Sequence, residues 1–222
     1  MAAHKRTEYF QGEAGRLQVV IDAPAQLPLR GLALVAHPHP LMGGTLDNKV
    51  AQTLARAFSD VACEAWRLNF RGVGESEGEH ASGQGETEDM LRLATEITTR
   101  HPGLPLFLAG FSFGGYVQAR VAARLLADPA GPQARRLMLV APAVARFDVP
   151  AVPAGTLLIH GEQDDVIPLA QLLDWARPQE LPVLLVPGAD HFFHRRLAII
   201  RTAVVSAARE ALDDDARIGE GT

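Results

Sequence analysis

One serine and the residues around it are the first place in this chain where chemistry is indicated. Ser112 is at the centre of the run Gly110-Phe111-Ser112-Phe113-Gly114, between an apolar run typical of a strand and a segment with helical spacing. The flanking glycines have no Cβ, so a strand and a helix can pack closely around a serine that projects from a sharp turn. Such a serine is a candidate nucleophile, but it needs a base within hydrogen-bonding reach, and the base needs an orienting acid.

Two later segments supply an acid and a base. Asp164 and Asp165 follow an apolar strand-like run at 157–161, and His191 follows another at 183–188. An imidazole titrates near neutral pH, so it can take a proton and return it. Residue types alone leave the choice between the two aspartates open. The pair His37 and His39 also suggests a metal site with His191 as third ligand, although the histidines have roles without a metal.

These residues are positioned by strand-like and helix-like segments that alternate almost throughout. The spacing predicts strands at 16–21, 31–37, 62–70, 105–109, 136–141, 155–160 and 182–187, and helices after 45 and 88 and at 116–126, 169–176 and 195–212. Thr45 is the expected cap of the first helix. Apolar strands separated by amphipathic helices indicate a mostly parallel sheet covered on both faces. Ligands bind such sheets beyond the carboxyl ends of the strands, where Ser112, the aspartates and His191 all fall.

Composition sets limits on partners and location. Apolar residues make up 47% and charged residues 21% of the 222 residues, and the net charge is 21 − 26 = −5. We expect no nucleic-acid binding and, without a long apolar run, no membrane span. The lone cysteine, Cys63, is expected to be buried and inert. We expect one cytoplasmic domain over 1–222 whose last residues, 213–222, form a frayed polar tail.

Five segments in the same order resemble the α/β-hydrolase superfamily: residues 31–40, 69–76, 110–115, 160–168 and 188–191. The resemblance covers nearly the whole chain. It implies a three-layer α/β/α sandwich with about seven or eight strands, and no metal or cofactor. It makes Ser112 the nucleophile and His191 the base. In similar family members one residue separates the acid from the segment that corresponds to Val-Ile-Pro at 166–168, so the resemblance implies Asp164 as the acid, with Asp165 as the alternative.

The resemblance also indicates which amides would stabilise a tetrahedral intermediate. One is the backbone N–H of Phe113, just after the nucleophile. The other comes from the loop after the strand ending at His37, where His39 matches the donor position. Pro38 and Pro40 have no N–H to donate. The next amides, at 41 and 42, are the alternatives.

The segment in which many family members carry a helical cap is short here, covering only residues 143–154. We therefore expect no cap domain and an open cleft, with Leu41, Phe147, Val166 and Phe192 in its apolar wall; Phe111 is assigned to the core. The chain is similar to small cap-less bacterial carboxylesterases of the serine-aminopeptidase and dienelactone-hydrolase group. Because dienelactone hydrolases use a cysteine, a serine at 112 argues against that role.

The expected activity is hydrolysis of small or short-chain acyl esters, with water as the second substrate. Alternatives that keep the same three residues are a thioesterase, an acyltransferase or an aminopeptidase, and a non-catalytic scaffold is a further alternative. Arg71 is expected to anchor its loop. The acidic run at 75–89 is expected to be solvated and, if it overhangs the site, to disfavour anionic substrates. A homodimer through a sheet edge or a helix is compatible with the sequence, which does not select it.

Overall fold

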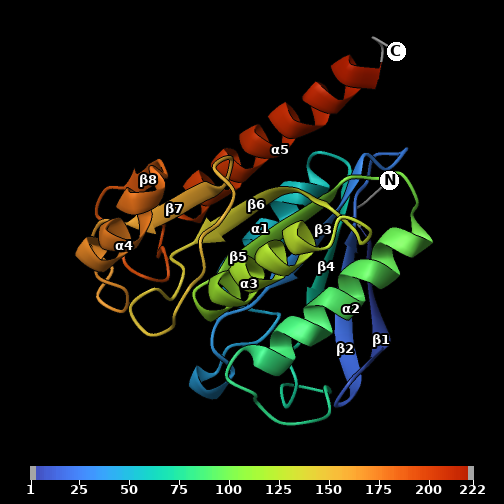
Figure 1. Cartoon of the computed structure of the whole chain (residues 1–222), viewed down its shortest axis with the longest axis horizontal. Coiled ribbons are helices and arrows are strands. Elements are labelled where there is room, and N and C mark those ends of the chain that lie inside the picture. The colour runs from blue at the N-terminus through green and yellow to red at the C-terminus, as the bar shows by residue number, and fades with distance from the viewer. Residues whose placement is uncertain (1–3, 220–222) are drawn as a thin grey trace.

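An eight-stranded sheet runs through the middle of the computed structural model, which describes residues 4–219, with side chains through 214 (Figure 1). Its strands lie in the order β1-β2-β4-β3-β5-β6-β7-β8. Their bounds are β1 His4–Gly12, β2 Gly15–Ala23, β3 Gly31–Ala36, β4 Cys63–Leu68, β5 Leu106–Phe111, β6 Ala134–Val140, β7 Leu157–Gly161 and β8 Val183–Val186. The strands from β4 to β8 in this order are parallel, whereas β1 and β2 form an antiparallel hairpin at one edge.

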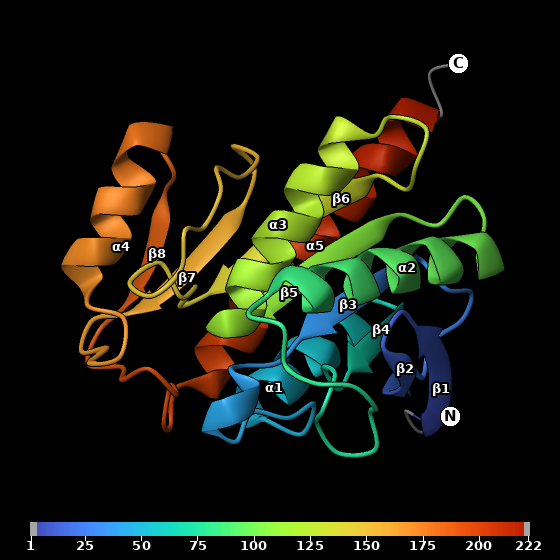
Figure 2. The same ribbon diagram turned by 60° about the horizontal axis from the view of Figure 1, so that its bottom comes forward.

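In the described part of the chain, five helices cover the two faces of the sheet. They are α1 Lys49–Ser59, α2 Gln84–Arg100, α3 Phe113–Ala127, α4 Leu169–Ala176 and α5 Leu197–Gly219, with short 3-10 turns at Pro40–Met42 and Arg177–Gln179. In Figures 1 and 2, α2 and α3 lie on one face and α1 and α5 on the other, so the molecule has three layers. Within residues 4–219, none of the helices combines the length and the apolar composition that crossing a bilayer requires.

The pattern of buried residues explains why the central strands read as continuous apolar runs. Every residue of β3, β4 and β5 is buried. Along β3, Leu32 and Leu34 pack into the core under α2 and α3, whereas Ala33 and Val35 pack into the core under α1 and α5. Alternate side chains of a strand point to opposite faces, and both faces here are covered by helices.

The parallel register brings four strand ends to one edge of the sheet. β3 ends before His37, β5 ends before Ser112, β7 is followed by Asp164, and β8 is followed by His191. Residues more than 100 positions apart in the sequence therefore meet in one place.

Three details differ from the expectations. β1 was not predicted, because it is an edge strand whose side chains are mostly exposed and polar. Asn48, not Thr45, caps α1: its Oδ1 accepts from the amides of Val50 and Ala51, whereas Thr45 Oγ1 accepts from Asp47 N in the preceding turn. The expected frayed tail is wrong for 213–219, which continue α5; residues 220–222 lie outside the described residues.

Candidate active site

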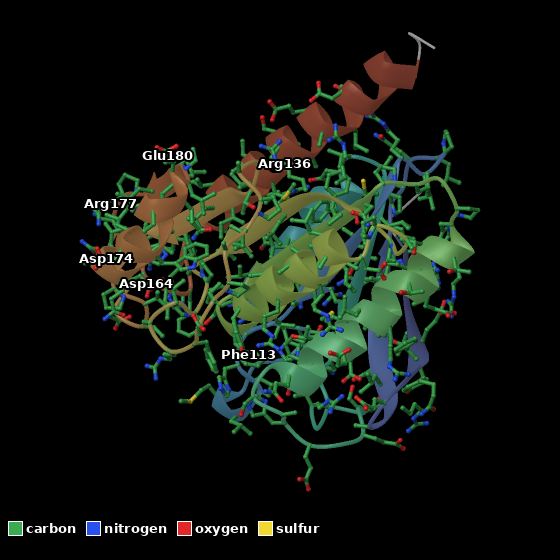
Figure 3. All side chains as sticks on the ribbon, viewed as in Figure 1. Phe113, Arg136, Asp164, Asp174, Arg177 and Glu180 are labelled. Carbon is green, nitrogen blue, oxygen red and sulfur yellow. The ribbon has the colours of Figure 1, made fainter. Side chains whose placement is uncertain are left out.

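Ser112 is held in a strained turn between β5 and α3. Its backbone φ of 55° and ψ of −117° lie in a region that residues with a side chain rarely adopt. The neighbouring glycines make this turn possible. A Cβ on Gly110 would overlap the carbonyl of Gly114, and one on Gly114 would overlap the carbonyls of Ala36 and His37. Figure 3 labels Phe113, the first residue of α3, which directly follows Ser112.

Ser112, His191 and Asp164 are joined by two hydrogen bonds. His191 Nδ1 lies 2.7 Å from Asp164 Oδ2, and His191 Nε2 lies 3.1 Å from Ser112 Oγ. A carboxylate only accepts, so Nδ1 carries the imidazole hydrogen and Nε2 accepts from the serine hydroxyl. All three side chains are buried, at 8%, 3% and 6% exposure for Ser112, His191 and Asp164. The arrangement leaves the serine hydrogen-bonded to an unprotonated nitrogen.

The loop after β7 holds the Asp164 carboxylate in place. Asp164 Oδ1 accepts from the amides of Val166 at 2.9 Å and Ile167 at 2.7 Å, which leaves Oδ2 for His191. His160 Nε2 donates to the Ile167 carbonyl at 2.9 Å and holds the same loop from below. Burial lowers the pKa of His160 and favours its neutral form. Asp165 is exposed and makes none of these contacts, so the geometry distinguishes the two aspartates that the residue types left open.

The His37 side chain forms hydrogen bonds with the loops that follow β3 and β4. Its Nε2 accepts from Phe70 N at 3.0 Å, so its Nδ1 is protonated and donates to the Pro38 carbonyl at 2.7 Å. The ring is completely buried, and burial lowers its pKa to about 4. His37 is therefore a neutral structural residue near pH 7, and both of its nitrogens are used within the fold.

Two backbone amides near Ser112 have no acceptor in the described part of the chain: those of Phe113 and His39. The alternatives in the His39 loop are occupied. Leu41 N donates to His39 Nδ1 at 3.2 Å, and Met42 N donates to the His39 carbonyl at 3.1 Å. The structure thus leaves unpaired the two amides that the sequence selected as oxyanion donors.

A cleft of about 550 Å³ opens in front of Ser112. One wall is aromatic: the ring of Phe113 lies 4.8 Å from His39 and 5.3 Å from Phe147, measured between centroids. Phe192 covers the other side, with its ring 5.2 Å from that of His191. The lining residues are Pro38, His39, Met42, Gly43, Gly44, Asn48, Ser112, Phe113, Ala143, Arg146, Phe147, Val166, Ile167, His191 and Phe192.

Comparisons with known proteins agree with this fold. The family model described as serine aminopeptidase, S33 matches residues 43–153. A lid-less α/β serine hydrolase from Xanthomonas campestris is 33% identical with a TM-score of 0.85, over 95% of this chain and 96% of that one. An α/β serine hydrolase homologue from Coxiella burnetii is 34% identical with a TM-score of 0.81, over 93% and 98%. An uncharacterized Rickettsia prowazekii protein is 28% identical, over 83% of this chain and 81% of its own.

The chain belongs to the α/β-hydrolase superfamily. It is a serine hydrolase with the expected α/β/α fold, and it has no cap. Where other members carry a cap, residues 141–156 of this hydrolase form only turns and loops between β6 and β7. One of these turns is closed by bonds from the amides of Arg146 and Phe147 to the Ala143 carbonyl.

Three of the four predicted pocket residues line the cleft of the hydrolase: Phe147, Val166 and Phe192. The prediction for Leu41 is wrong. The 3-10 turn at Pro40–Met42 directs Leu41 to solvent, at 73% exposure, and Met42 lines the cleft instead. Asn48 and Arg146 also line it and were missed, because a polar residue in a loop carries no periodic signal.

The acidic run of the hydrolase is partly buried, which corrects the expectation of a solvated stretch. Asp89 accepts from Arg71 Nε at 2.8 Å, and Arg71 also donates to the Gly85 carbonyl, so the predicted anchoring role of Arg71 is confirmed. Glu86 accepts from the amides of Ala81 and Gly83 at the start of α2. No residue of this run lines the cleft. Within residues 4–219, no three His, Cys, Asp or Glu side chains are grouped to hold a metal ion.

Proposed function

We propose that Ser112, His191 and Asp164 form a catalytic triad and that the protein is a carboxylesterase for small or short-chain acyl esters. The observation that carries the proposal is the continuous chain of hydrogen bonds from Asp164 Oδ2 through His191 to Ser112 Oγ, with distances of 2.7 and 3.1 Å. A nucleophile, a base and an orienting acid within this reach are what acyl transfer requires.

Acylation follows from the protonation states. Ser112 Oγ attacks the ester carbonyl carbon while its proton passes to His191 Nε2, and Asp164 stabilises the imidazolium that forms. The carbonyl oxygen becomes an oxyanion between the amides of Phe113 and His39, at the start of α3, where the helix dipole also favours negative charge. His191 then gives its proton to the leaving alcohol oxygen as the carbon–oxygen bond breaks.

Deacylation repeats these steps with water. His191 takes a proton from a water molecule that attacks the acyl carbon, and a second oxyanion forms in the same place. Collapse of this intermediate returns the proton to Ser112 Oγ and releases the carboxylic acid. The enzyme regains its starting state with one ester and one water consumed.

The main alternative is an aminopeptidase, since the matching family model is described as serine aminopeptidase, S33. An aminopeptidase must recognise a protonated α-amino group, and a buried or cleft-lining carboxylate is the usual partner of an ammonium. The described residues that line this cleft include no aspartate or glutamate, and their one permanently charged side chain is Arg146. This charge distribution favours an ester over a peptide with a free N-terminus.

The test is a parallel assay of p-nitrophenyl esters from acetate to dodecanoate and of amino-acid p-nitroanilides, together with labelling by a fluorophosphonate probe. We expect labelling of the wild type and highest kcat/KM for short esters, because the cleft holds about 550 Å³. Ser112→Ala should abolish labelling and lower kcat by about 10⁴-fold or more. Faster turnover of the anilides would favour the aminopeptidase.

The matched control is Ser82→Ala, which removes a serine hydroxyl away from the cleft and should retain labelling and turnover. A folded wild-type protein that neither labels nor hydrolyses any ester, thioester or anilide would refute the proposal in favour of a scaffold.

A further inference from the structure

Among the residues that the structure describes, Arg146 is the one arginine that lines the active-site cleft, and its backbone is tied to that of Ser112. Its amide donates to the Ala143 carbonyl at 3.0 Å, and the Ala143 amide donates to the Ser112 carbonyl at 3.2 Å. Two consecutive hydrogen bonds therefore connect the backbone of Arg146 to that of Ser112. These bonds hold the backbone of Arg146 close to the Ser112 turn, and the exposed side chain of Arg146 lines the cleft.

The guanidinium of Arg146 has no hydrogen bond or ion pair with any described residue. The buried carboxylates of Asp164 and Glu86 bond other groups. Asp164 bonds His191 and two amides of its own loop, and Glu86 is buried and bonds the amides of Ala81 and Gly83. A planar fork of N–H donors at the cleft thus lacks the carboxylate that it matches best.

Asn48 adds a second donor from the opposite loop. Its Oδ1 accepts from Val50 N at 2.9 Å and from Ala51 N at 3.3 Å, so its carbonyl is used in capping α1. Its side-chain NH₂ has no acceptor among the described residues, and Asn48 lines the cleft. The side chains of Arg146 and Asn48 therefore both offer N–H donors at the cleft wall.

Arg146 adjoins the aromatic wall of the cleft in sequence and lines the cleft with it. It precedes Phe147, whose ring centroid lies 5.3 Å from Phe113 and 6.0 Å from His39, the two proposed oxyanion residues. Burial lowers the pKa of His39; the charges of His80 and Arg146 lower it further, and the charge of Glu86 raises it. The leaving group belongs on the side of His191, which protonates it and which Phe192 covers.

We infer that the preferred substrates are esters whose acyl part ends in a carboxylate, that is, monoesters of dicarboxylic acids, bound by Arg146. This inference rests on the proposed esterase function. It reverses the expectation from the acidic run, because the residues of that run stay out of the cleft and an arginine lines it.

The experiment compares monoethyl succinate, glutarate and adipate with neutral ethyl esters whose acyl chains have the same length and a terminal isopropyl group. We expect the carboxylate member to have the higher kcat/KM, by about fivefold at the best-fitting length, as for a partly exposed ion pair. The advantage should shrink in 0.5 M NaCl, because salt screens exposed charges.

Three variants make the test specific. The quantity compared is the kcat/KM of the carboxylate ester divided by the kcat/KM of the matching neutral ester. Arg146→Gln should lower this ratio about fivefold. Arg146→Glu should lower it further and raise turnover of the ethyl ester of 4-(trimethylammonio)butanoic acid. The matched control is Arg92→Gln, which removes an exposed arginine on α2 that does not line the cleft, and which should leave the ratio unchanged.

Failure of this inference and failure of the esterase proposal give different results. If neutral esters are hydrolysed and Arg146→Gln leaves the ratio unchanged, the inference is refuted while the esterase function stands. A direct measurement covers the case in which no ester is turned over: NMR titration of glutarate should perturb the Arg146 side chain in the wild type. Equal binding of glutarate by wild type and Arg146→Gln would refute carboxylate recognition.

Discussion

Replacing Asp164 by Asn changes one atom of the site and isolates the orientation of His191. The Asn carbonyl oxygen can still accept from the amides of Val166 and Ile167, as Asp164 Oδ1 does at 2.9 and 2.7 Å. The NH₂ group then occupies the place of Oδ2, which accepts from His191 Nδ1 at 2.7 Å. A donor at this place needs an unprotonated Nδ1, so the imidazole hydrogen moves to Nε2, and Ser112 loses its base.

The magnitude follows from that loss. An imidazole in the wrong tautomer costs about 10⁴-fold in kcat, or about 5 kcal/mol of transition-state stabilisation. Folding should change little in Asp164→Asn, because both amide bonds of the loop are kept. Asp164→Ala should lose activity and also stability, since two amides lose their acceptor at about 1–3 kcal/mol each.

The assay measures kcat for p-nitrophenyl butyrate and the melting temperature of each variant. Asp165→Asn is the matched control: this aspartate is exposed and lacks the contacts of its neighbour, so kcat should stay within about twofold of the wild type. The reasoning is refuted if Asp165→Asn loses about 10⁴-fold while Asp164→Asn stays active.

Three further predictions concern the residues around the site. Burial lowers the pKa of His37 to about 4, from about 6.5 in an unfolded chain. Between these two pH values the unfolded state binds more protons than the folded state does. About 3 kcal/mol of the free energy of unfolding, present above pH 6.5, is therefore lost as the pH falls through 4. Urea unfolding at pH 4.5 and 7 should show a weaker pH dependence in His37→Gln, and an equal dependence would contradict this account. Gly114→Ala should lower both the melting temperature and kcat, since its Cβ overlaps the carbonyls of β3 and the loop after it, whereas Gly155→Ala has open space and should be tolerated. Burial raises the pKa of Cys63 to about 12, so Ellman's reagent at pH 8 should find no reactive thiol in the native protein and one after unfolding.

The parts of the fold and site that follow a repeating pattern could be predicted from the sequence. The central strands are buried on both faces, so they read as apolar runs, and their order fixes which strand ends meet. The glycines around Ser112 predict a close approach of β5 and α3, and the structure has this close approach. Apolar runs and glycine positions are local patterns that several neighbouring residues repeat, so one sequence is enough to detect them.

The features that were missed depend on tertiary contacts. β1 is held by its pairing with β2, and nothing in its polar sequence indicates burial. Asn48 and Thr45 are both good caps, and the choice between them depends on where the preceding turn is tied to β4: Arg67 Nη1 donates to the Leu46 carbonyl. The place of Arg146 in the cleft follows from the path of the turn after β6, which no spacing rule gives.

The absence of a cap has a kinetic consequence for what happens to the acyl group. With only turns between β6 and β7, the acyl-enzyme would face bulk solvent throughout its lifetime. Nucleophiles would then compete for it in proportion to their concentration, and water is far the most abundant, so we expect release as a free acid to dominate over transfer to an alcohol. We also expect a catalytic cycle without the opening or closing of a cover. Its maximal rate would be set by bond making and by diffusion, without activation at a lipid–water interface.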